Sequence, residues 1–145
     1  MSRPSISTYR TPDAEQRAGR KKVVVHMAGT DTIRPMVQCV APKGGDTNLH
    51  AHPNTDGYWF VLTGTSRWYG EDDEVLADLG PMESIMVPAG TKYWFEATGE
   101  VPLEILHVAI TKPGVDPRRD RVDIRPGATQ AERPSIGIDA DRREV

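Results

Sequence analysis

The sequence predicts an all-β fold, and three observations carry that prediction. Short β-type runs recur between residues 22 and 111 at a spacing of about 8–12 residues, which is typical of a sandwich or barrel. Turn residues separate the runs, as in Asp56-Gly57 and Pro88-Ala89-Gly90. No run alternates with a convincing helix of about 12 residues, so a parallel α/β sheet is excluded.

Nine runs are expected to be strands. They are Lys22–Met27, Met36–Ala41, Thr47–His52, Tyr58–Thr63, Ser66–Tyr69, Glu74–Leu79, Ser84–Val87, Tyr93–Ala97 and Leu103–Thr111. They define a barrel over residues 22–111, preceded by a polar extension at 1–21. Within this extension, Thr11-Pro12-Asp13 has the residues of a helix start, and Gly19 would end that short helix.

Residues 112–145 form a polar C-terminal tail. From residue 113 onward the tail has no aromatic residue, six bulky aliphatic residues, and seven acidic against seven basic side chains. Such a segment buries too little apolar surface to offset its ordering entropy alone. We therefore expect the tail to stay mobile or to lie against something else, such as a partner subunit.

Composition excludes several classes of function. The formal net charge is −3, so there is no basic excess to neutralise phosphates, and nucleic acid is not expected as a partner. The apolar runs are far shorter than the roughly 18 residues of a membrane helix, and residues 1–10 lack a secretory signal. A single cysteine, Cys39, permits no internal disulfide and suits a reducing compartment. We expect a cytoplasmic protein without a membrane partner.

The most informative pair of residues is His50 and His52. Residues i and i+2 of a strand point to the same face, so the two imidazoles project toward one point. Neutral imidazole is the commonest transition-metal ligand in proteins, and two imidazoles make half of a coordination shell. Alone, a His-x-His pair is a weak signal.

The surrounding spacing resembles the cupin superfamily. Gly44, His50, His52 and a strand that closes at Gly64 match its first motif, and Met82 to Tyr93, with Pro88-Ala89-Gly90, matches its second. The resemblance covers roughly residues 36–111 and implies a double-stranded β-helix, or jelly-roll, barrel. It does not fix the reaction, because this fold hosts many enzymes as well as non-catalytic binders.

The departures from the family pattern concern the remaining ligands. Metal-binding cupins usually supply a Glu in the first motif, where this chain has Gly57, and a third His in the second, where it has Tyr93. Asp56 is a candidate substitute for the Glu, although Asp56-Gly57 is also a strong turn dipeptide. His107 is a candidate third imidazole, with a buried structural histidine as the alternative.

Aromatic residues mark the expected pocket. Eight of the nine lie between residues 58 and 95, which indicates a packed core, an aromatic-lined ligand pocket, or both in one barrel. Trp59 and Val61 should face inward beside the histidines, and Phe95 belongs to the same cluster. These three are the expected substrate-binding residues.

The resemblance implies an enzyme that acts on a small molecule at a mononuclear site. One divalent transition metal (iron, manganese, nickel or zinc) would be held by His50 and His52 and would support Lewis-acid or oxygen-dependent chemistry of the dioxygenase, isomerase or cyclase type. Tyr93 would be the catalytic polar or acid/base group. Two alternatives stay open: a metal-free binding cupin, and a metal-free enzyme that transfers protons through His50 and Tyr93.

A homodimer is also expected. The strand at Lys22–Met27 would otherwise be an exposed hydrophobic sheet edge, and small cupins commonly pair through such edges.

Overall fold

The computed structural model describes residues 4–42, 48–125 and 135–144. The chain folds almost entirely into strands, with one short helix, α1 (Ala14–Arg17), and one 3₁₀ turn at Pro117–Arg119. The strands are β1 (Ser5–Thr8), β2 (Lys22–His26), β3 (Arg34–Val40), β4 (Leu49–Ala51), β5 (Thr55–Thr63), β6 (Thr65–Tyr69), β7 (Val75–Leu79), β8 (Ser84–Val87), β9 (Trp94–Thr98), β10 (Leu103–Thr111), β11 (Val122–Arg125), β12 (Ser135–Asp139) and β13 (Asp141–Glu144). In the described part of the chain, no helix is long and apolar enough to cross a membrane.

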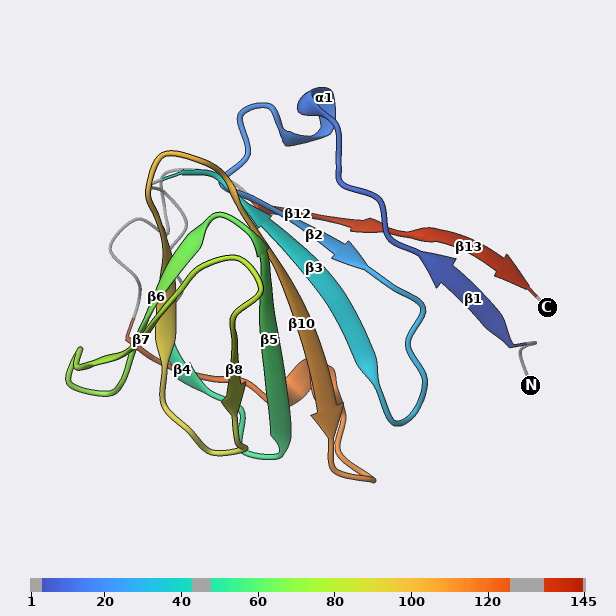
Figure 1. Ribbon diagram of the computed structural model, residues 1–145. Helices are drawn as coiled ribbons and strands as arrows, with labels where there is room; N and C mark the ends of the chain where they lie inside the picture. Colours follow the sequence, from blue (N-terminus) through green and yellow to red (C-terminus); the bar gives the residue numbers. More distant parts are fainter. Residues whose placement is uncertain (1–3, 43–47, 126–134, 145) are drawn as a thin grey trace.

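Two β walls enclose the barrel (Figure 1). One is a six-stranded sheet in the order β12-β2-β3-β10-β5-β8. The other consists of β7-β6-β9 and the pair β11-β4, and the isolated antiparallel bridge between His50 and Tyr93 joins these two parts. All nine predicted strands are present, with most ends within two residues of the prediction, so the all-β prediction is confirmed.

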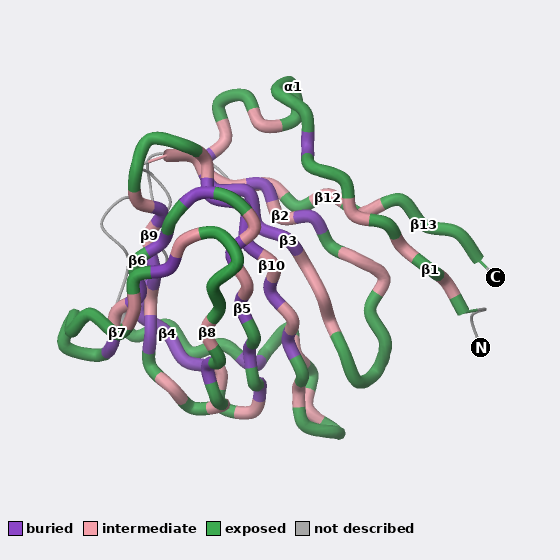
Figure 2. Tube along the Cα trace, in the orientation of Figure 1, coloured by how far each residue is buried: buried purple, intermediate pink, exposed green. Residues whose placement is uncertain are grey.

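The barrel interior is an apolar core. Trp68, Phe95, Val61, Leu103 and Ile105 are at most 1 % exposed, and Figure 2 shows buried residues on strands of both walls. The aromatic rings pack on one another: the Trp68 and Phe95 rings stack with centroids 4.5 Å apart. The aromatic cluster is therefore mainly a packed core.

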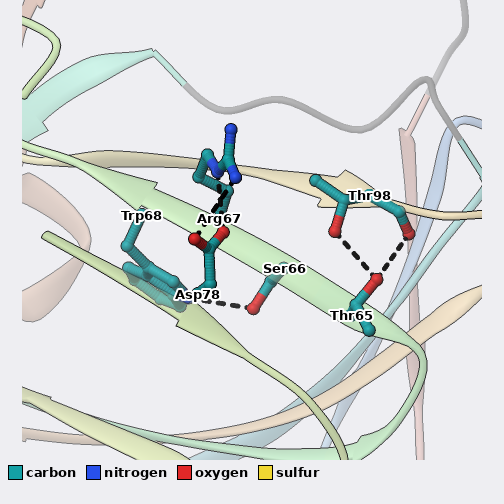
Figure 3. A network of polar contacts seen from close by, with 6 residues as sticks. All are labelled: Thr65, Ser66, Arg67, Trp68, Asp78 and Thr98. Carbon is teal, nitrogen blue, oxygen red and sulfur yellow. Dashed lines mark hydrogen bonds and ion pairs between the residues drawn. The ribbon is translucent and has the colours of Figure 1, made fainter. Parts of the chain in front are cut away.

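Strand β6 shows how alternation builds this wall. Ser66 and Trp68 point inward, where the Trp68 indole N–H donates to Ser66 Oγ at 3.0 Å. Between them Arg67 points outward and forms a bidentate ion pair with Asp78 of β7, with N···O distances of 2.6 and 3.2 Å (Figure 3). The Ser66 hydroxyl thus satisfies a polar group that the core would otherwise leave unpaired.

The outer face of the large sheet carries a second apolar cluster. It contains Val23, Val25, Val37 and Cys39, which are buried. The N-terminal extension covers its edge: the hydroxyls of Tyr9 and Thr11 both donate to the carboxylate of Glu104, at 3.0 and 2.9 Å.

Helix α1 begins slightly later than predicted. Its N-cap is Asp13 and not Thr11, because the Asp13 carboxylate accepts from Gln16 N while the Gln16 side chain accepts from Asp13 N, a reciprocal capping box.

The expectation for the first long strand is wrong. Strand β2 pairs antiparallel with β3 and parallel with β12, so it is not a sheet edge. Two strands of the tail lie against the barrel of their own chain: β11 pairs with β4, and β12 extends the large sheet. Strands β1 and β13 pair into a separate ribbon that brings the two chain ends together (Figure 1).

Candidate functional site

The two motif histidines lie on and just after β4. His50 is 3 % exposed, and its backbone forms paired hydrogen bonds with Tyr93, at 3.1 Å from His50 N and 2.9 Å to His50 O. The imidazole of His50 lies 5.0 Å from that of His52 and 4.5 Å from the Tyr93 ring, between ring centroids. The rings of His50, His52 and Tyr93 therefore form one cluster.

The second motif is hydrogen-bonded to the first. Gly90, in the Pro88-Ala89-Gly90 turn, has a φ of +84°, and its N–H donates to the carbonyl of His52 at 2.9 Å. Gly64, which closes the first motif, has a φ of +81°, and a Cβ there would lie 2.5 Å from the carbonyl oxygen of Pro102. Both the positive φ and this close approach of the backbone require a glycine at position 64. Gly44 of the first motif lies outside the described residues.

Backbone carbonyls fix the tautomers of both histidines. Nδ1 of His50 contacts the carbonyl oxygen of Asn48, and Nδ1 of His52 lies 3.0 Å from the carbonyl oxygen of Asp120. A carbonyl only accepts, so each Nδ1 carries the proton and each Nε2 carries a lone pair. Metal-ligating histidines are commonly oriented by this kind of contact.

Burial keeps both imidazoles neutral. Loss of solvent lowers the pKa of His50 to about 4, helped by the nearby Arg121 guanidinium and opposed by the contact with Asn48. Burial also lowers the pKa of His52, and the contact with the Asp120 carbonyl opposes it in part. At neutral pH the two side chains are lone-pair donors and not cations.

Tyr93 supplies a protonated phenol. It is 2 % exposed, and burial raises the pKa of its hydroxyl far above the ordinary value, against weaker opposing effects of Arg121 and the Trp59 indole. The Trp59 N–H, although turned toward this region, makes no hydrogen bond of good geometry within the described residues. The phenol therefore keeps its proton near neutral pH.

His107 fills the room that Gly57 leaves. Its ring stacks on Trp59 with centroids 3.7 Å apart and planes 6° apart, and a Cβ at position 57 would lie 3.0 Å from His107 Nε2. His107 thus occupies the space of the missing Glu side chain. Burial lowers the pKa of His107 to about 3, and its Nδ1 has no hydrogen-bond partner among the described residues.

These side chains border a small cavity. His52, Tyr93, His107, Gly57 and Thr55 line it, together with Val87, Pro88 and Thr91. Its volume of about 10 Å³ is roughly that of one water molecule. Gly57 does not leave a larger space beside the aromatic rings, because His107 takes up that volume.

The C-terminal segment completes the site, which the sequence did not indicate. Asp120 is 4 % exposed, and its carboxylate accepts from Asn54 N, Asn54 Nδ2 and Thr55 Oγ1 at 2.9, 2.9 and 2.6 Å. Burial alone would raise the pKa of this carboxyl, but these hydrogen bonds outweigh it and hold the pKa below the usual value. In the β11–β4 register, Asp123 stands opposite His50, and it pairs with Arg121 at 2.9 Å.

Three other candidate residues lie away from this cavity. Asp56 is on β5 and not in a turn; it is exposed, and its carboxylate accepts from Ala89 N at 2.8 Å. Because it alternates with the inward Gly57, it points away from the histidines. Val61 and Phe95 are in the packed core and do not border the cavity, whereas Trp59 contacts the site through His107.

The imidazole nitrogens of His50 and His52 are of the kind that binds a metal, but two nitrogens do not fill a coordination shell. Two neutral imidazoles with free Nε2 atoms are good ligands for a divalent transition metal. No group of three His, Cys, Asp or Glu side chains among the described residues is placed to hold a metal ion together. His50 and His52 therefore fit as two protein ligands, which would leave the other coordination positions to water or substrate.

The fold and the paired motifs define a double-stranded β-helix protein. A sequence model of the cupin domain matches residues 36–109, about half of the chain. The chain belongs to the cupin family. No curated protein matches it significantly.

Solved structures agree on the fold. An uncharacterised protein with a double-stranded β-helix domain from Klebsiella pneumoniae is 16 % identical, with a TM-score of 0.59 over 69 % of this chain and 76 % of that one. The nucleoside dehydratase Pac13 is 15 % identical, with a TM-score of 0.57 over 74 % and 79 %. An oxalate decarboxylase from Bacillus subtilis is 23 % identical, with a TM-score of 0.50 over 64 % of this chain but 24 % of its own length. At these identities the likeness shows the fold alone.

Proposed function

We propose that this cupin is a small-molecule enzyme whose reactive centre is the cluster of His50, His52 and Tyr93, and that the two histidines hold one divalent transition metal. The observation that carries the proposal is the fixed tautomer of both imidazoles. Each Nδ1 proton is used on a backbone carbonyl, and the buried, neutral rings keep their Nε2 lone pairs for another partner.

The chain would divide the chemistry among its residues. When bound, iron, manganese, nickel or zinc would supply Lewis acidity or oxygen activation, the chemistry expected for an isomerase, cyclase or dioxygenase. His50 and His52 would hold the ion, each oriented by a backbone carbonyl. The protonated Tyr93 would donate a hydrogen bond, or its proton, to a substrate oxygen beside the histidines.

A second candidate function is metal-free proton transfer between His50 and Tyr93. The two rings lie 4.5 Å apart, and burial holds one as a neutral base and the other as a neutral acid. The lack of a three-ligand group among the described residues favours this alternative. The remaining alternative is a metal-free binding protein, whose ligand would lie outside the 10 Å³ cavity because that space holds only about one water molecule.

The deciding experiment is elemental mass spectrometry of the purified protein. The proposal predicts about one metal per chain in the wild type, strong loss in His50→Ala and His52→Ala, and full retention in Tyr93→Phe. Metal-free wild-type protein, even after incubation with Zn²⁺ or Fe²⁺, would rule out the metal and leave proton transfer. Loss of metal in Tyr93→Phe would instead make the phenol a ligand.

We also propose a homodimer, now through the outer face of the large sheet. Tyr58, Met86 and Ile110 lie on three of its strands and are 40, 53 and 46 % exposed. Exposed apolar groups on a continuous face commonly mark an interface. Sedimentation of a single species of 16.0 kDa at micromolar concentration would contradict a dimer.

A further inference from the structure

A concave site of the described part of the chain lies at the rim of the barrel. Its volume is about 760 Å³, within the range of small-molecule sites. Its walls are the loop before β3, the end of β10 with the segment after it, and Asp56. Thr111 borders this rim pocket, and its hydroxyl contacts the Thr55 hydroxyl at 2.8 Å, while Thr55 borders the histidine cavity. This threonine pair therefore connects the walls of the two spaces.

Arg34 connects the rim pocket with the histidines. It is partly buried, and it lies opposite Ala109 in the β3–β10 register, on the face that carries His107 two residues earlier. Its positive charge is close enough to lower the pKa values of both His52 and His107. The guanidinium forms no hydrogen bond or ion pair within the described part of the chain, although it has five donors.

The local charges favour an anion beside Arg34. Lys112 lines the same pocket and, among the described residues, also lacks an ion pair. Asp31 and Asp56 share the wall, but Asp31 is exposed in the loop and the Asp56 carboxylate accepts from Ala89 N on the outer face. Asp116 is close enough for Arg34 to help lower its pKa, but its carboxylate accepts from the backbone N and the Nε of Arg118. The histidine site has Gly57 where a cupin carboxylate would stand, and the carboxylate of its buried Asp120 accepts from Asn54 and Thr55.

We infer that the rim pocket binds a small carboxylate, with Arg34 as the residue that recognises it and Lys112 as a supporting charge. The inference rests on the proposed function, because it names the substrate class that would reach the histidine centre. A planar guanidinium with free donors matches a carboxylate in bidentate geometry, and such charge-assisted hydrogen bonds are strong. A neutral molecule of the same shape would leave the guanidinium unpaired.

The test is an NMR titration with malonate and with malonamide, its uncharged counterpart. Malonate should bind saturably and shift the backbone amides of residues 30–34 and 110–115, whereas malonamide should not. Arg34→Gln should weaken malonate binding by about 10- to 100-fold, the value of a lost charge-assisted hydrogen bond. Arg34→Lys should weaken malonate binding to an intermediate degree, because lysine keeps the positive charge but cannot form the bidentate hydrogen bonds of a guanidinium.

Arg17 provides the matched control. It is also partly buried and lines different surface pockets, so Arg17→Gln should leave malonate binding unchanged. Equal binding of malonamide, unchanged binding in Arg34→Gln, or shifts confined to other regions would overturn the inference. Binding of inorganic phosphate in place of malonate would overturn the carboxylate assignment.

Metal content, measured on the same samples, separates this inference from the proposed function. Arg34-dependent malonate binding to protein that stays metal-free after incubation with Zn²⁺ or Fe²⁺ would support the rim site and contradict the metal centre. A metal-loaded protein that does not bind malonate would contradict the rim site alone.

Discussion

Replacing Gly57 with alanine tests the packing at the centre of the site. The added Cβ would lie 3.0 Å from His107 Nε2 and 3.3 Å from Trp59 Nε1, and both rings are buried and stacked on each other. Overpacking of this kind costs about 1–3 kcal/mol. The less flexible unfolded chain of the alanine variant offsets about 0.4–1 kcal/mol of this cost. We expect a net loss of about 0.5–2 kcal/mol in the free energy of unfolding.

The measurement is urea unfolding of four proteins: wild type, Gly57→Ala, His107→Ala and the double variant. Because the clash is with His107, the cost of the alanine should largely disappear in the His107→Ala background, which is a coupling that a double-mutant cycle reports directly. A cost that is the same in both backgrounds would show that His107 does not fill this space. Stabilisation by Gly57→Ala in the wild-type background would refute the same reasoning.

Three further predictions concern burial and hydrogen bonding. Ser66→Ala should lower stability in urea by about 1–3 kcal/mol, because it leaves the buried Trp68 N–H unpaired, and a neutral effect would contradict this. Asp120→Ala should release the segment that orients His52 and shift its imidazole ¹⁵N resonances, which an unaltered spectrum would disprove. The pKa of His107 is about 3 in the fold and roughly 6.5 in the unfolded chain, so protons bind the unfolded state first as pH falls. Metal-free protein should therefore lose about 1.3 kcal/mol from this group between pH 7.5 and 5.5, and His107→Leu should lack that loss; equal pH slopes would exclude the effect.

The barrel was predictable because its signals are local. Alternating apolar runs and turn residues depend only on neighbouring positions, so strands such as β5 and β10 could be placed from the sequence. The error at Asp56-Gly57 has the same origin. A strong turn dipeptide was overridden by pairing, since both residues lie in β5 opposite Ile110 and Ala109 of β10.

The site was only half predictable, because its second half depends on contacts between distant segments. The spacing of His50, His52 and Tyr93 follows from two motifs whose turns fix their positions. The role of Asp120 follows from a tail that pairs with β4, and the polar composition of that tail carries no pairing signal. An aspartate that precedes a short strand could have been noted, but nothing local connects it with His52.

The most direct test of the central claim is the side-chain ¹⁵N spectrum of the histidines, before and after addition of Zn²⁺. The account predicts that His50 and His52 carry their protons on Nδ1 in the metal-free protein at pH 7.5, and that Zn²⁺ shifts Nε2 of both rings together. Protons on Nε2 in either ring, or Nε2 resonances that do not respond to Zn²⁺, would contradict the proposal that this histidine pair holds a metal.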